Sequence, residues 1–182
     1  GESQRAYQAY GDASQISLRA GDIYTAVLST SNQAGVLAEW GKLRQAAAME
    51  QRAIDLATEH GAAQMPVLGA VQAQLAEYLY EWNDLDGAKQ HLTEAIERIE
   101  RAHNPRLLLL SHVNMAWMLW AQGDPVGARI HLTRAEQLAR DHALPLQYSS
   151  KVVVCQVRFW LVETNLPAAK VWMQQSKLGV DD

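Results

Sequence analysis

The segment Gln122-Gly123-Asp124-Pro125, followed by Ala128, decides the fold of this chain. Pro125 suits the first turn of a helix, because proline lacks the N–H group and has a fixed φ. A shift of about 40 residues brings three further segments of the chain into the same register. They are Trp40-Gly41-Lys42-Leu43 before Ala46, Trp82-Asn83-Asp84-Leu85 before Ala88, and Glu163-Thr164-Asn165-Leu166 before Ala169. The chain is therefore built from a repeat in which a short turn opens a helix.

Small residues mark the same helix face in every repeat. Alanines anchor the second helices at Ala6, Ala46, Ala88, Ala128 and Ala169, and small residues follow seven positions later at Ala13, Ala53, Ala95, Ala135 and Ser176. Residues seven apart lie on one face of an α-helix, so this face lets two helices approach closely. Upstream of each turn, a small residue precedes a large one by three positions, at Ala34 and Leu37, Ala76 and Leu79, Ala116 and Leu119, and Val157 and Trp160.

All five prolines stand where a helix is expected to begin, which favours an all-α chain. We predict about nine helices, near residues 3–20, 23–40, 43–60, 66–82, 85–102, 106–122, 126–142, 146–163 and 167–178. A single helix pair cannot bury its apolar stripe, so we expect a right-handed superhelical solenoid of antiparallel helix pairs. The chain begins with a second helix that lacks its partner. We therefore expect residues 1–182 to be one tetratricopeptide-like repeat domain excised from a larger protein.

Composition narrows the possible functions. The chain has 182 residues, of which 48% are hydrophobic and 20% charged, so it can form an ordered core. Its net charge of -4 argues against a basic surface, so we expect no nucleic acid to bind this segment. Apolar runs such as Leu107 to Leu110 are far shorter than a membrane span. The single cysteine and the lack of a leader favour a cytoplasmic location, and uncapped solenoid ends are compatible with a homo-oligomer.

The repeat resembles a known family. A small residue, a large one three positions later and two alanines seven apart are similar to the tetratricopeptide repeat, although the period is about 40 residues instead of about 34. Two pairs of stretches resemble the sensor solenoid of large ATP-dependent LuxR-family regulators of the maltose-regulon-activator type: Leu37 to Ala47 with Ala53 to Ala57, and Met118 to Asp124 with Ala135 to Ala139. This resemblance implies an upstream nucleotide-switch domain, a solenoid that receives signals, and a downstream helix-turn-helix domain that binds DNA.

We expect neither catalysis nor a bound cofactor or metal ion. The nearest match to a phosphate-binding loop, Gly35 to Leu43, has one intervening residue too many and lacks the Ser or Thr that holds magnesium. His91 and His131 share one repeat position, and no histidine pair has the spacing of a helical zinc site. Cys155 stands among valines, which predicts a buried small hydrophobe. The sequence offers no pairing of a nucleophile with a base.

The first helix of each repeat carries the candidate binding residues, because the resemblance implies that first helices line a concave groove. The candidates are Glu77, Tyr80, Glu81, Trp117, Trp120, Lys151 and Arg158. Aromatic rings beside charges of both signs suit a sugar, a peptide segment or a partner helix. The alternative is that Trp117 and Trp120 only pack between neighbouring helices, as we expect for Trp40 and Trp82.

Two functions are compatible with these observations. We expect a signal-sensing module of a multidomain bacterial transcription regulator that binds a peptide, a partner protein or a small-molecule inducer in its groove. The alternative is a generic tetratricopeptide-like adaptor that recruits a peptide or partner protein and has no role in transcription. A nucleotide-switch domain upstream and a helix-turn-helix domain downstream in the parent gene would distinguish the first function from the second.

Overall fold

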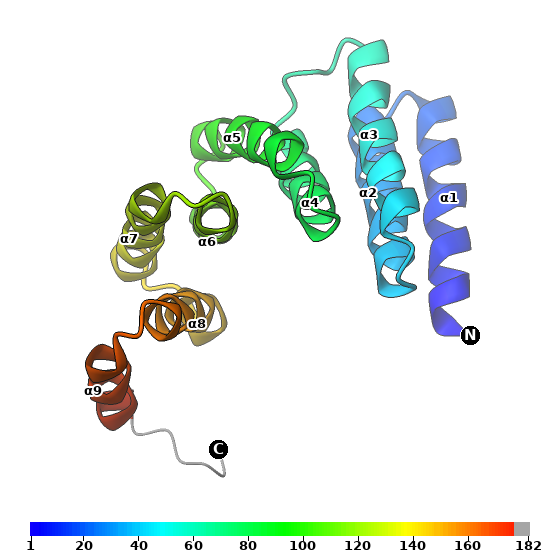
Figure 1. Cartoon of the computed structure of the whole chain (residues 1–182). Helices are drawn as coiled ribbons and strands as arrows, with labels where there is room; N and C mark the ends of the chain where they lie inside the picture. Colours follow the sequence, from blue (N-terminus) through cyan, green and yellow to red (C-terminus); the bar gives the residue numbers. More distant parts are fainter. Residues whose placement is uncertain (177–182) are drawn as a thin grey trace.

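The computed structural model describes residues 1–176, and these residues form nine α-helices and no strand (Figure 1). The helices are α1 (Glu2–Ala20), α2 (Ile23–Glu39), α3 (Leu43–Glu59), α4 (Val67–Glu81), α5 (Leu85–Arg101), α6 (Pro105–Ala121), α7 (Pro125–Asp141), α8 (Leu146–Val162) and α9 (Leu166–Ser176). They confirm the predicted all-α solenoid, and the predicted boundaries agree within one residue. The exception is the predicted end of the last helix at 178, which lies outside the described residues.

The turns between paired helices share one left-handed backbone position. Gly41, Asn83, Gly123 and Thr164 have φ values of 71, 68, 79 and 57° respectively. A left-handed residue ends the first helix sharply and lets the chain reverse into the second. Glycine adopts this conformation without strain, whereas the branched side chain of Thr164 makes it costly. Asp84 and Asp124 then cap α5 and α7, each by accepting a hydrogen bond from a backbone N–H, at 3.1 and 2.8 Å.

Small residues join the helices of each pair, as the sequence predicts. The central anchors Ala46, Ala88 and Ala128 are fully buried, and so are Ala53, Ala95 and Ala135 seven positions later. Ala6 and Ala169 are only partly buried, because α1 packs against α2 alone and the described part of α9 packs against α8 alone. Gly69 on α4 is also required for a close approach, since an added Cβ would lie 2.7 Å from Cγ1 of Ile99 on α5.

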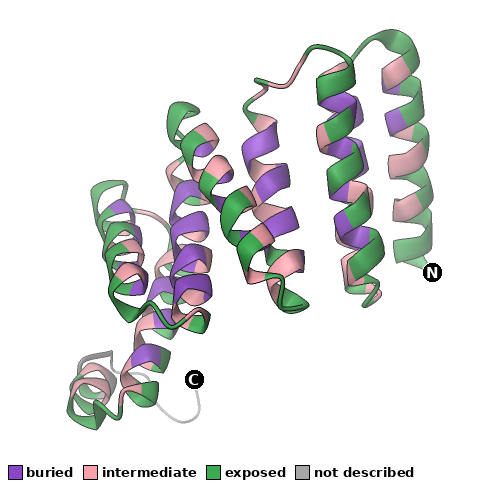
Figure 2. Ribbon diagram, turned by 45° about the horizontal axis from the view of Figure 1, so that its top comes forward, coloured by how far each residue is buried: buried purple, intermediate pink, exposed green. Residues whose placement is uncertain are grey.

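The helices form two layers along an arc (Figure 1). Helices α2, α4, α6 and α8 contact one another in order and make the inner layer, while α3, α5 and α7 pair with the inner helices that precede them. Figure 2 shows buried residues concentrated on the inner helices and exposed residues on the outward faces. None of the helices in the described residues combines the length and the apolar character needed to cross a membrane. The inner layer is where the candidate binding residues lie.

The two tryptophans that follow α2 and α4 have different surroundings. Trp40 is partly buried, and its ring lies 5.5 Å from that of Tyr7 on α1, which agrees with its predicted packing role. Trp82 keeps 36% of its surface exposed, so it packs less completely than Trp40. The reason is that Trp82 lies beside the polar turn that opens α3, where Lys42 and Arg44 leave an open hollow next to the ring.

Candidate binding site on the inner layer

Five of the seven candidate residues line one hollow of about 420 Å³ on the inner layer. Glu77, Tyr80 and Glu81 come from α4, Trp117 from α6 and Arg158 from α8. The volume falls in the range of pockets that hold small ligands. The repeat register therefore brings together side chains from three successive repeats.

Two amide side chains hold the carboxylate of Glu77 in place. Asn114 on α6 donates a hydrogen bond to its Oε1 at 2.5 Å, and Gln74 on α4 donates one to its Oε2 at 2.9 Å. Each carboxylate oxygen can accept more than one hydrogen bond. Glu77 is therefore fixed in position and still able to accept a hydrogen bond from a ligand.

The indole of Trp117 forms an aromatic wall of the hollow. The guanidinium of Arg158 lies over this ring, with its central carbon 5.4 Å from the ring centroid. Phe159, the next residue on α8, meets Trp117 edge-on with a centroid distance of 5.2 Å and an interplanar angle of 78°. These two contacts from α8 set the orientation of the indole. The wall is thus held by packing between two inner helices.

Two candidate residues, Trp120 and Lys151, do not line the hollow. Trp120 stacks on Phe159 at a centroid distance of 4.1 Å and an angle of 16°, and it packs against the apolar cluster of the C-terminal half. It therefore fits the alternative interpretation of helix-helix packing. Lys151 is exposed on α8. It lies seven residues before Arg158, about 10 Å along the helix, and is not among the residues that line the hollow.

The lining residues that were not predicted as candidates include two polar ones, Tyr78 and Asn114. Tyr78 is buried, and burial raises the pKa of its hydroxyl, with a further contribution from the negative charges of Glu50 and Glu77. Asn114 lies three residues before Trp117, so the two share a helix face. Asn114 could have been predicted from the sequence, because it is a polar residue three positions before Trp117 within the apolar sequence of α6.

An acidic side chain, Glu50, is completely buried in α3. Its Oε1 accepts a hydrogen bond from Ser31 Oγ on α2 at 3.0 Å, and its Oε2 has no hydrogen-bond partner among the described residues. Burial raises the pKa of Glu50 to about 8, although the hydrogen bond from Ser31 acts in the opposite direction. The carboxyl group is therefore mostly protonated at neutral pH.

Two histidines meet between α6 and α7. The Nδ1 atoms of His112 and His131 are 2.9 Å apart, so one ring donates a hydrogen bond to the other. Burial lowers the pKa of both rings, and for His112 the charges of His131 and Arg134 lower it further, to about 4. The sequence explained His131 by the repeat position that it shares with His91, and this position does not predict the contact with His112. Nowhere in the described residues do three or more His, Cys, Asp or Glu side chains gather to hold a metal ion.

Two other sequence features have structural roles, as predicted. The stretch Gly35 to Leu43 spans the end of α2 and the turn before α3, where Gly41 takes the left-handed conformation. Cys155 on α8 is fully buried, and burial raises the pKa of its thiol to about 12. Such a thiol stays protonated and behaves as a small apolar side chain.

Solved structures with similar folds are helical-repeat proteins. BtubC from P. vanneervenii superposes with a TM-score of 0.68 at 20% identity and covers 79% of this chain and 59% of that one. The apo form of RapI gives a TM-score of 0.65 at 14% identity, over 95% of this chain and 70% of that one. A kinesin light chain with tetratricopeptide-like repeats from Podospora anserina gives 0.64 at 12% identity, over 92% of both chains. These similarities establish the solenoid fold.

Sequence comparison identifies relatives among transcription regulators. The "HTH-type transcriptional regulator MalT" of Yersinia enterocolitica is 25% identical over the whole of this chain, and that of Yersinia pestis strain Pestoides F is 24% identical. The chain spans only 20% of the length of these relatives. The family model described as "MalT-like TPR region" matches residues 1–182. The chain belongs to the family of MalT-like tetratricopeptide regions.

Proposed function

We propose that this chain is the signal-sensing module of a multidomain bacterial transcription regulator, and that the hollow between α4, α6 and α8 binds the signal. The observation that carries the proposal is the hollow itself, in which an aromatic wall, two carboxylates and a guanidinium from three repeats meet. The description of the relatives as HTH-type transcriptional regulators supports the setting. In this proposal the module works in the cytoplasm, and a separate helix-turn-helix domain of the parent protein contacts DNA.

The lining of the hollow specifies the chemistry of its ligand. Tyr80 and Trp117 offer aromatic faces, Glu77 and Glu81 accept hydrogen bonds, and Arg158 donates them. A sugar or a short peptide combines apolar patches with several O–H or N–H groups and fits this lining. Because Trp117 is already mostly buried, covering the rest of its ring would contribute at most roughly 2 kcal/mol. Hydrogen bonds to Glu77, Glu81 and Arg158 must therefore provide most of the specificity.

Ligand binding can be tested on the chain of residues 1–182. A thermal-shift screen with neutral sugars and short peptides should find at least one compound that raises the melting temperature, and titration calorimetry then gives its Kd. We expect Glu77→Gln and Arg158→Ala to weaken that compound at least about tenfold, because each removes a polar contact. Lys151→Ala is the matched control from the inner layer and should leave the Kd unchanged. Equal binding by all variants would rule out the hollow as the site.

A test of the regulatory role requires the parent protein. The parent gene should encode a nucleotide-switch domain before residue 1 and a helix-turn-helix domain after residue 182. In a promoter-reporter strain, Glu77→Gln in the parent should remove the response to the compound found in the screen, while Lys151→Ala should preserve it. A parent that lacks both domains would favour the adaptor function instead.

A further inference from the structure

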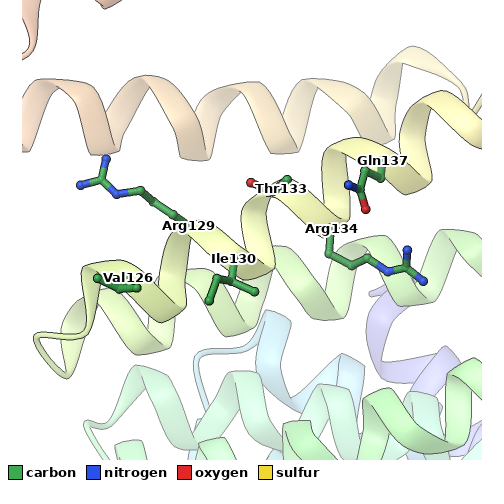
Figure 3. A pocket seen from close by; sticks show the side chains of 6 residues that line it. All are labelled: Val126, Arg129, Ile130, Thr133, Arg134 and Gln137. Atoms are coloured by element: carbon green, nitrogen blue, oxygen red, sulfur yellow. The ribbon is translucent and has the colours of Figure 1, made fainter.

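The outer face of α7 carries an apolar strip that faces away from the solenoid core. Val126 and Ile130 lie one helical turn apart and keep 68% and 64% of their surfaces exposed. Figure 3 shows them beside the other residues of the same open depression of about 490 Å³. The six residues, which we call the α7 strip, are Val126, Arg129, Ile130, Thr133, Arg134 and Gln137.

The repeat register shows that packing within the chain does not require this apolar strip. The positions equivalent to Val126 and Ile130 hold Arg44 and Ala48 in α3, and Asp86 and Gln90 in α5. Those helices pack into the same solenoid with polar or small residues on the outer face. Single exposed apolar residues are ordinary, but two branched ones on one face of a helix, inside a depression, are typical of a contact surface.

Two arginines of the α7 strip, Arg129 and Arg134, point to its opposite edges (Figure 3). Arg129 pairs with Glu163, with its Nη2 2.5 Å from Oε1, while Arg134 lies 3.9 Å from a carboxylate oxygen of Glu100. The two arginine side chains are 58% and 47% exposed. A guanidinium has five N–H donors, so each arginine can bind a further carboxylate. The strip contains no acidic residue. A complementary surface is therefore apolar in its centre and acidic along both edges.

We propose that the α7 strip docks an amphipathic helix of a partner protein. The apolar stripe of that helix would cover Val126 and Ile130, and its flanking Glu or Asp side chains would pair with Arg129 and Arg134. A second copy of this chain fits less well. Two α7 strips face to face would gather four guanidinium groups, and the carboxylates beside them, Glu163 and Glu100 of each copy, are already paired with Arg129 and Arg134. The α7 strip lies on the outer layer, so this proposal is independent of the inner hollow.

Synthetic peptides can test the proposal on the chain of residues 1–182. One helical peptide of about 18 residues carries leucines along one face and glutamates on both flanks, and a second has lysines in place of the glutamates. Fluorescence anisotropy should show binding of the acidic peptide only. We expect Ile130→Asp to weaken it at least about tenfold and Arg134→Ala to weaken it about threefold. Raising the salt concentration should weaken it as well.

Matched controls separate docking from loss of folding. Gln90→Asp introduces the same negative charge at the equivalent position of α5 and should leave peptide binding unchanged, as should Glu77→Gln in the inner hollow. Circular dichroism should show native helicity for Ile130→Asp, because this side chain is mostly exposed. The proposal is wrong if the acidic peptide does not bind, if the lysine peptide binds equally, or if Ile130→Asp has no effect. A dimer in sedimentation that Ile130→Asp dissociates would assign the strip to a second copy and overturn the partner helix.

Discussion

The N-terminal half of the solenoid buries the acid Glu50, and the C-terminal half buries the base His112 against His131. In the N-terminal half, Glu50 is uncharged when its carboxyl binds a proton, and its pKa is raised to about 8. In the C-terminal half, His112 and His131 are uncharged when they lose a proton, and the pKa of His112 is lowered to about 4. Both groups are therefore neutral between about pH 4 and pH 8, and they become charged in opposite directions: Glu50 as the pH rises above 8 and His112 as it falls below 4. The comparison teaches that one repeat scaffold can give its two halves opposite pH responses.

The repeat register makes this difference more specific. Glu50 occupies the position that holds Leu92 in α5 and Leu132 in α7, and both leucines are buried. It is therefore a polar exception at a core position.

His112, in contrast, occupies a position that is polar and buried in the two preceding repeats as well, where it holds Thr30 and Gln72. Each of these three inner-helix residues meets a polar side chain of a neighbouring second helix: Thr30 meets Ser14 at 2.9 Å, Gln72 meets Glu94 at 2.6 Å, and His112 meets His131 at 2.9 Å. His112 is thus one form of a recurring buried polar contact.

Glu50→Leu should have the largest effect, because it restores the leucine of the other repeats. The folded-state pKa of about 8 lies above the ordinary value of 4.5, so the folded chain holds the proton of Glu50 more tightly than the unfolded chain does. This contribution to the free energy of unfolding is fully present below pH 4.5 and is lost as the pH rises through 8. We expect the variant to raise the free energy of unfolding at pH 8 by roughly 3 to 5 kcal/mol. Urea unfolding at pH 5 and pH 8 measures this change.

The reverse substitution is the control for Glu50. Leu92→Glu places an acid at the same repeat position in α5 and should destabilise the fold strongly at pH 8, since a buried unpaired charge is costly. Should Glu50→Leu lower stability at pH 8, the carboxyl would have a favourable role that its burial does not suggest.

His112→Gln should have the next largest effect, with the opposite pH dependence. The folded-state pKa of about 4 lies below the ordinary value of 6.5, so the native chain loses stability as the pH falls from 6.5 towards 4. His112 accounts for roughly 3 kcal/mol of this loss, and glutamine, as at Gln72, should remove that part, while His131 continues to contribute because burial lowers its pKa as well. Urea unfolding at several values between pH 4 and pH 7, in the Glu50→Leu background, measures the slope of the free energy of unfolding against pH without the contribution of Glu50. His142→Gln, at the exposed end of α7, should retain it, and an unchanged slope in His112→Gln would contradict the assignment.

Thr164→Gly should have the smallest effect, and it extends the comparison to the turns. The turn in the N-terminal half has Gly41 at the left-handed position, while the last turn has Thr164 with a φ of 57°. Glycine should relieve the strain of the branched side chain and stabilise the fold by up to about 1 kcal/mol. Thermal unfolding measures this gain, and Gly41→Thr should cost a similar amount. A lower melting temperature for Thr164→Gly would show that the greater conformational entropy that glycine loses on folding outweighs the relief of strain.

Much of the fold could be predicted from the sequence, because it depends on local signals. Prolines, turn residues and regularly spaced alanines determine where each helix begins and which face it buries, so nearly every boundary agrees. The inner hollow was predicted in part, since five candidates follow the repeat register. Glu50 and His112 were not predicted, because each is defined by a contact with another helix. The apolar packing of Trp120 likewise depends on Phe159, which only the folded chain brings close.

The sharing of the hollow among three inner helices has a mechanical consequence. Each repeat of a solenoid touches only its neighbours, so small angles between repeats add up along its length. Glu77 and Arg158 belong to helices on either side of α6, and the gap between them therefore changes when the rod bends. If the hollow binds its ligand as proposed, a ligand that held both residues would act as a brace and favour one curvature. Local recognition would then be converted into an angular displacement that grows with the distance from the brace.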